Sequence, residues 1–134
     1  MYGRRGDIGR RAYVMTHQTG WFCGTGCLRL RPEPRAISGW YLFNFLGQDD
    51  VVSLIAGRAQ GVTMPNLNSK VMASVPVRCP PRELQESFFR MTFPMAEGRE
   101  ALVAKVSNLR RTRDLLLPRL LSGQIDLEAA EAAA

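Results

Sequence analysis

The sequence SFFRMTFPMAEGREALVAKVSNLRRTRDLLLPRLLSG, residues 87–123, decides the fold of the C-terminal part of this chain. Apolar side chains recur in it at intervals of seven residues, which is the spacing of a helix that packs against another helix. We therefore predict a long helix of coiled-coil type over residues 81–123. Its predicted seam consists of Phe88, Met95, Leu102, Leu109 and Leu116.

Two residues interrupt these heptads. Pro94 has no backbone N–H and Gly98 is a poor helix former, so we expect a kink or a break there. Gly123 is expected to end the helix. A helix with one apolar stripe cannot bury it on itself, so a second helix must cover it, from this domain or from another chain. A core helix of the same domain is the alternative to a docking or spacer helix.

The preceding part, residues 1–80, has the signals of a small mixed domain. Ser38 is a plausible N-cap for a helix closed by Gly47, and Asp49 and Asp50 open a second helix. A loop rich in Gly, Asn and Pro follows, and then a short helical piece. The expected strands span 11–15, 27–31 and 74–78, the expected loop 57–68 and the expected short helix 69–73.

These signals predict an α/β (α+β) fold followed by a long C-terminal helix. We expect a domain over residues 1–80, the helix over 81–123 and a tail over 124–134.

Length and composition fit one globular domain. The chain has 134 residues, of which 46% are hydrophobic and 22% charged, which argues against disorder and fibrous repeats. Its apolar stretches are far shorter than the ~18 to 20 residues of a membrane span, and no apolar signal-peptide core follows the basic opening. We therefore expect no membrane partner and a cytoplasmic location. Three cysteines without framework spacing suggest reduced thiols.

Positive charge is concentrated at the two ends of the chain. The net charge is +6, with +5 in residues 1–35 and +3 in residues 101–127, and 16 of the 18 basic residues are arginines. The planar guanidinium fork suits phosphates and guanine edges. Nucleic acid is therefore the first partner to expect, and an ordinary solvated basic surface is the alternative.

Two segments offer side chains for DNA binding. Residues 4–11, RRGDIGRR, form a basic segment whose glycines let guanidinium groups approach a phosphate chain. The 57–68 loop and its end carry amides that can pair with adenine and a lysine suited to phosphate. A charged hairpin and an ordinary polar loop are the alternatives. The candidate DNA-binding residues are Arg4, Arg5, Arg10, Arg11, Gln60, Thr63, Asn66 and Lys70.

The sequence does not indicate catalysis. His17 is the single histidine, and no nucleotide-loop, zinc-protease or nucleophile-elbow motif occurs. Cys23 and Cys27, with His17 and Cys79, lack the paired spacing of zinc ligands, so we expect no metal and no cofactor. We expect a non-catalytic protein.

Three motifs resemble those of a known family. They are GDIGR at residues 6–10, the stretch from residue 63 through VPVRCPP at 75–81 to Leu84-Gln85, and LRRTRDLLLPRLLSGQID at 109–126. In order and spacing they resemble the specificity subunit of type I restriction–modification enzymes, over nearly the whole chain up to Leu127. The last motif is the most specific of the three.

The resemblance implies a target-recognition domain of mixed α/β fold, present in part over residues 1–80, that reads one half of a bipartite sequence in double-stranded DNA. It also implies a spacer helix that packs antiparallel against its counterpart and holds the methyltransferase (modification) subunits, with the restriction subunit as a further partner. No catalytic residue is implied. The chain resembles only the later part of one recognition domain and one helix.

The resemblance leaves open how this helix is paired. Its partner is expected to be a second copy of the chain or another specificity fragment. The alternative function is a truncated, helix-mediated assembly module without autonomous DNA reading. A weaker alternative is the recognition domain of a single-chain restriction enzyme with a methyltransferase segment.

Overall fold

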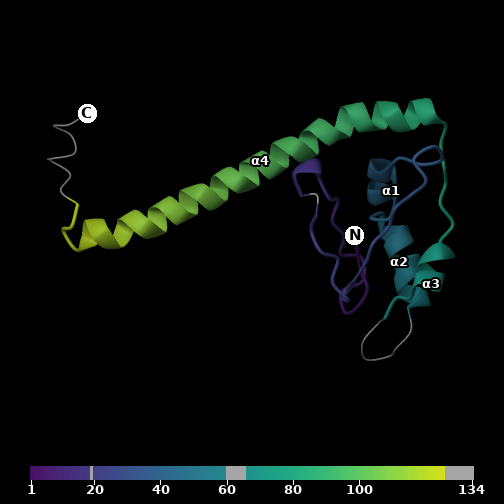
Figure 1. Ribbon diagram of the computed structural model, residues 1–134, viewed down its shortest axis with the longest axis horizontal. Helices are drawn as coiled ribbons and strands as arrows, with labels where there is room; N and C mark the ends of the chain where they lie inside the picture. The colour runs from purple at the N-terminus through teal and green to yellow at the C-terminus, as the bar shows by residue number, and fades with distance from the viewer. Residues whose placement is uncertain (19, 60–65, 126–134) are drawn as a thin grey trace. The chain divides into compact units, whose positions relative to one another are not determined.

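The computed structural model describes residues 1–18, 20–59 and 66–125 (Figure 1). The chain forms two compact units, Met1–Met91 and Thr92–Ala134. In chain order the elements are β1 (Tyr2–Gly3), the 3-10 helix η1 (Thr16–Gln18), β2 (Cys27–Leu28), α1 (Gly39–Phe45), α2 (Asp49–Arg58), α3 (Ser69–Ala73) and α4 (Arg82–Leu121). The structure confirms the expected mixture of helix and strand and the long C-terminal helix, and most of its regular structure is helical.

The sheet is small and centred on Tyr2. β1 and β2 are antiparallel, with Tyr2 opposite Leu28 and Gly3 opposite Cys27. An isolated antiparallel bridge also joins Tyr2 to Arg11. Since each strand has two hydrogen-bonding edges, Tyr2 lies between two extended segments.

The strand predictions were largely wrong. In the run 11–15, Arg11 alone pairs, through an isolated bridge, and in the run 27–31 only residues 27 and 28 form a strand. The run 74–78, which the structure describes in full, contains no strand. Propensity does not make a strand unless a neighbouring segment pairs with its backbone groups. The third run instead lies at the surface, with Val75 as its one buried residue.

The three short helices begin where the sequence predicts. The Ser38 side chain accepts a hydrogen bond from the Tyr41 N–H at 3.2 Å and so caps α1. The N-cap of α2 is Gln48, and Asp49 and Asp50 occupy its first turn. There the positive end of the helix dipole stabilises their negative charges. The Asn68 side chain caps α3 by accepting from the Val71 N–H at 2.8 Å.

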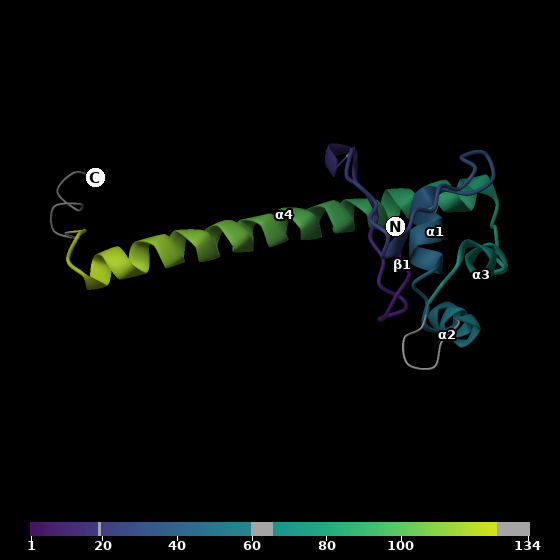
Figure 2. The ribbon, with the colours of Figure 1, turned by 60° about the horizontal axis from the view of Figure 1, so that its bottom comes forward.

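The core of the Met1–Met91 unit joins β1 to the three short helices. Figure 2 shows α1 next to β1. The Tyr2, Ile55 and Leu67 side chains are almost completely buried. The buried cluster consists of Tyr2, Phe45, Leu46, Val51, Ile55, Leu67, Met72 and Val75.

One buried polar side chain connects the first turns of α4 to this unit. Gln85 is 2% exposed, and its Oε1 accepts a hydrogen bond from the Ser38 N–H at 2.7 Å. Its Nε2 donates to the Pro80 carbonyl at 2.9 Å and to the Ala36 carbonyl at 3.4 Å. A backbone N–H can only donate, so the contact with Ser38 fixes the orientation of the amide. Gln85 therefore holds the cap of α1 against the start of α4.

α4 continues through both predicted interruptions. Of the kink or break expected at Pro94 and Gly98, the break is wrong, because the helix runs without a gap from Arg82 to Leu121. A proline inside a helix removes one hydrogen bond and crowds a carbonyl, which costs about 3 kcal/mol, and hydrogen bonds on both sides outweigh this local cost in a long helix.

Gly123 ends the helix as predicted. It has a φ of 71°, its N–H donates to the Leu120 carbonyl at 3.2 Å, and the Gln124 N–H donates to the Arg119 carbonyl at 2.9 Å. This pair of bonds is the Schellman motif. In the described ranges, no helix is both long and apolar enough to cross a membrane.

The Gln85 amide generates a stability prediction. Gln85→Leu is expected to lower the free energy of unfolding by about 1–3 kcal/mol, because the Ser38 N–H loses its acceptor in a buried place. Chemical denaturation measures this change. Glu86→Gln, which alters an exposed ion pair with Arg82, is the matched control and is expected to change stability by less than about 1 kcal/mol. Equal stability of the two variants would contradict the role assigned to Gln85.

The turn at residues 6–10 generates a second stability prediction. Gly9 has a φ of 109°, and a Cβ there would lie 2.9 Å from Val52 Cγ1. Gly9→Ala is expected to cost about 1–3 kcal/mol from backbone strain, with the steric clash in addition. Gly6→Ala retains only the strain, since its φ is 73° with open space around it, and Gly24→Ala has neither problem. Thermal melts should rank the three variants in that order of damage, and any other order would refute this reasoning.

Candidate nucleic-acid interface

The structure brings the two predicted DNA-binding segments together. Arg5 forms an isolated antiparallel bridge with Asn66. Beside it, the Leu67 N–H donates to the Arg4 carbonyl at 2.8 Å. The basic turn and the end of the 57–68 loop therefore lie side by side, although more than sixty residues separate them in the chain.

Among the four arginines of the basic turn, two are exposed. Arg5 and Arg10 lie at the surface. Nε of Arg10 is 3.3 Å from a carboxylate oxygen of Asp7, and both side chains are mostly in solvent. An ion pair in that setting contributes little and exchanges easily for another anion. Both guanidinium groups are thus available to a phosphate.

The other two arginines hold the fold together. Nε of Arg4 donates to the Leu67 carbonyl at 2.9 Å, and Nε of Arg11 donates to the Phe43 carbonyl at 2.9 Å. The Arg11 guanidinium also lies over the Phe43 ring, 5.0 Å from its centroid. A Cβ at Gly47 would overlap that guanidinium, so the glycine makes room for it. A cation at the C-terminal end of α1 is favourable for the helix dipole.

The loop candidates are placed unequally. Gln60 and Thr63 lie outside the described residues. Asn66 is half-buried, and its Oδ1 is buried without a hydrogen-bond partner among the residues that the structure describes. Lys70 is exposed in α3. Among these candidates, Lys70 therefore supplies a charge that is exposed to solvent.

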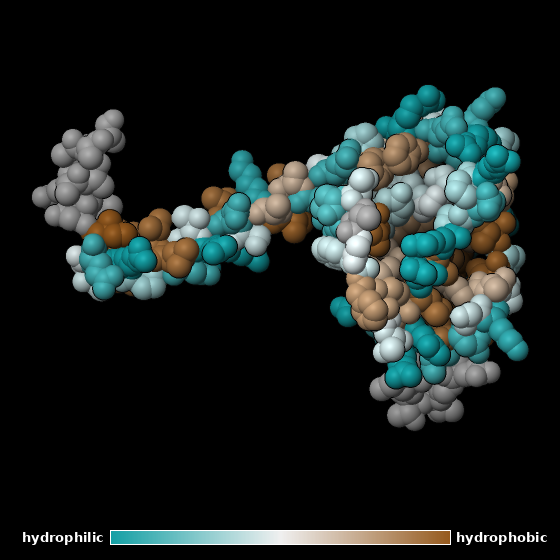
Figure 3. Space-filling view, in the orientation of Figure 1, coloured by the Kyte–Doolittle hydropathy of each residue, from teal (hydrophilic) through white to brown (hydrophobic). Residues whose placement is uncertain are grey.

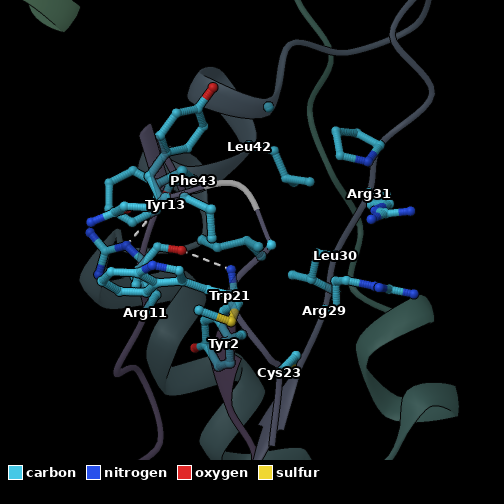
Figure 4. A pocket seen from close by; sticks show the side chains of 18 residues that line it. Tyr2, Arg11, Tyr13, Trp21, Cys23, Arg29, Leu30, Arg31, Leu42 and Phe43 are labelled. Carbon is cyan, nitrogen blue, oxygen red and sulfur yellow. Dashed lines mark hydrogen bonds between the residues drawn. The ribbon is translucent and has the colours of Figure 1, made fainter. Parts of the chain in front are cut away.

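A cleft of about 560 Å³ lies in the Met1–Met91 unit. Figure 4 shows Arg11 and Tyr13 on one side, Leu30 and Arg31 on the other and Leu42 between them. The Tyr13 ring packs edge-on against the Trp40 and Phe43 rings, with centroids 5.2 and 5.8 Å away. Trp21 lines the cleft and is 64% exposed. The charged side chains of the lining are Arg11, Arg29 and Arg31.

Burial changes two titrating groups at the base of this cleft. It raises the pKa of the Tyr2 phenol, an effect that the charge of Arg11 partly opposes. It also lowers the pKa of the Met1 α-ammonium group. This ammonium donates to the Ala12 carbonyl at 2.7 Å. Both groups take part in the packing of β1.

The sequence-predicted seam of α4 is mostly exposed. Phe88 is half-buried and its ring meets the Tyr41 ring edge-on at 6.3 Å. Met95, Leu102, Leu109 and Leu116 are all exposed, Leu102 to 64% and Leu109 to 60%. Figure 3 shows apolar patches along α4 between polar side chains.

Sequence reasoning missed the cleft and the role of Gln85. An amide in a heptad position looks like any polar surface residue, and only its burial reveals its partners. Trp21, an aromatic residue in a glycine-rich stretch without a predicted helix or strand, is the available signal for the cleft that it lines. Within the described residues, the cysteines, histidine and carboxylates form no group that could hold a metal ion.

Comparison of this chain with protein-family models, with curated proteins and with solved structures finds no match.

Proposed function

We propose that this chain is a DNA-recognition component that joins a larger assembly through α4, as a specificity fragment of a type I restriction–modification system does. The observation that carries the proposal is the exposed apolar seam of α4, in the segment whose sequence resembles the family's spacer helix. The proposed assembly partners are methyltransferase subunits and a second specificity segment. In this proposal the chain itself has no catalytic role.

The exposed seam supports an assembly role on physical grounds. Leu102, Leu109 and Leu116 lie on one face of a helix, and all three are exposed within the described chain. An apolar stripe of this length in water favours association, since each apolar side chain that leaves water contributes about 1.5–3 kcal/mol. A partner helix would remove the stripe from solvent.

The charges on α4 favour an antiparallel partner of the same kind. Between residues 92 and 100 there are two glutamates and one arginine, whereas between 101 and 121 there are five basic residues and one aspartate. In an antiparallel pair of such helices, the acidic segment of each lies opposite the basic segment of the other. In a parallel pair the two basic segments would repel each other.

The DNA-binding part of the proposal depends on the exposed cations of the Met1–Met91 unit. Arg5, Arg10 and Lys70 are exposed, and Arg5 lies beside Asn66 at the junction of the basic turn and the loop. Phosphate contacts from such side chains position a protein on DNA, and the base contacts then come from neighbouring loops. The loop at 57–68 is the neighbour proposed for base reading.

A second candidate function has its own support. The Arg4 and Arg11 guanidinium groups are used inside the fold, and the Asn66 side-chain oxygen is buried. These facts reduce the number of groups left for DNA. They favour an assembly module that binds partner subunits through α4 without reading DNA by itself.

Salt dependence tests the DNA contacts. In the presence of methyltransferase subunits, binding to a random duplex should weaken with salt, and Arg5→Ala and Arg10→Ala should each reduce the log–log slope by about 0.9 for the phosphate contact they remove. Fluorescence anisotropy over about 50–200 mM salt measures the slopes. Arg11→Ala is the internal control, because its effect is expected on stability and not on the slope. Unchanged slopes for Arg5→Ala and Arg10→Ala would refute these contacts.

Solution mass tests the assembly seam. Leu109→Asp places a charge in a dry helix interface and is expected to cost several kcal/mol of association free energy. Ser107→Asp adds the same charge to an exposed position outside the seam and should leave association unchanged. Sedimentation of each variant, with and without methyltransferase subunits, measures the complex. A folded wild-type monomer together with a Leu109→Asp variant that still joins the complex would rule out the seam as the interface.

A further inference from the structure

We propose that Phe22 inserts between neighbouring base pairs of duplex DNA, so that the protein also recognises how easily a base step opens. The proposal rests on the DNA-binding role proposed above and adds a contact that the exposed cations cannot make. It depends on where the segment 20–26 lies, on the exposure of Phe22 and on the charges around it.

The segment that carries Phe22 meets the basic turn at Arg4. The Arg4 N–H donates to the Gly26 carbonyl at 2.9 Å. The Arg4 carbonyl in turn accepts from the Leu67 N–H at 2.8 Å. Backbone hydrogen bonds of one arginine therefore hold both the segment of Phe22 and the end of the 57–68 loop. Phe22 thus belongs to a segment that adjoins the proposed DNA-binding residues.

Phe22 takes little part in the packing of its own unit. Its side chain is 90% exposed, more than any other large apolar side chain that the structure describes, and the adjacent Trp21 is 64% exposed. Two turns fix the backbone on either side of it. In the first, the Trp21 N–H donates to the Gln18 carbonyl at 3.3 Å, and in the second, the Cys27 N–H donates to the Gly24 carbonyl at 3.1 Å. Adjacent exposed aromatic residues on a fixed backbone mark a surface that meets a partner.

The charges around this segment favour a polyanion as that partner. Residues 1–32 contain six arginines and a single acidic residue, Asp7, which is itself paired with an arginine. The segment 20–26 carries no charge, and Arg29 and Arg31, which follow it, are both exposed. The partner must therefore be negatively charged and must also offer an apolar place for an aromatic ring.

Duplex DNA meets both requirements. Its phosphates lie outside and its stacked bases lie inside, and proteins that kink DNA insert apolar side chains, phenylalanine among them, between base steps. The free energy of opening a step depends on its sequence, because pyrimidine–purine steps such as TA are flexible and A-tracts are stiff. Phe22 therefore favours flexible steps at the position that it meets, without a hydrogen bond to any base.

Two duplexes of equal length test this preference. One repeats the TA step and the other is an A-tract, so their charges are equal and their stiffness differs. Each is titrated with the full chain and methyltransferase subunits and followed by fluorescence anisotropy. Phe22→Ala should lower the ratio of the two affinities, alternating duplex over A-tract, at least about fivefold, since loss of an aromatic contact with a base weakens binding by that much or more. The salt dependence should stay as in wild type, because no phosphate contact is lost.

Two control variants separate insertion from a general loss of apolar surface. Phe22→Leu keeps an apolar side chain that can enter a base step and should keep most of the ratio. Leu84→Ala shortens a side chain that is 61% exposed in the first turn of α4, and it should bind both duplexes as wild type does.

A fluorescent base reports the unstacking directly. The probe is the alternating duplex with 2-aminopurine in place of some adenines, whose fluorescence rises when the base leaves the stack. Wild type should raise this fluorescence on binding, and Phe22→Ala should bind without raising it.

Three results would overturn the proposal. A complex that binds neither duplex would remove the DNA-binding role as well, whereas equal affinity ratios for wild type and Phe22→Ala would remove the insertion alone. A Phe22→Ala variant that binds DNA as wild type does but no longer joins the methyltransferase subunits in sedimentation would make the ring a protein contact.

Discussion

The buried amide of Gln85 is the contact on which the junction of helix and domain depends. It accepts from the N–H of Ser38, the residue that caps α1, and donates to the Pro80 carbonyl just before α4 begins. An uncharged amide is the side chain that can do both at once in a buried place, because a carboxylate lacks the donor and an aliphatic residue lacks both. Two helix starts are thus positioned by one residue.

The packing of β1 is the second constraint on the Met1–Met91 unit. Tyr2 is bridged to both neighbouring segments and is almost completely buried among residues of α1, α2 and α3. The sheet around it ends after two residues on each strand, and the segments beyond it border the cleft. The cleft therefore lies where the paired part of the small sheet ends.

The proposed functions use different surfaces of the chain. The exposed cations Arg5 and Arg10 belong to the basic turn and Lys70 belongs to α3, whereas the apolar seam belongs to α4. Arg4 and Arg11 illustrate how a basic residue can serve the fold instead, since each donates to a backbone carbonyl more than thirty residues away. Counting arginines in the sequence overstates the charge that is free to meet a phosphate.

Local signals in the sequence determined the helices, and only the tertiary structure decided the strands and the roles of the polar residues. Ser38, Asn68 and Gly123 act within a few residues of themselves, so capping and helix ends could be predicted from neighbours alone. The break expected at Pro94 failed because a local penalty competes with the cooperativity of a long helix, which a single position does not reveal. Strand pairing, the burial of Gln85 and the internal use of Arg11 all depend on segments distant in sequence, and their contacts are set by the packing of the whole unit.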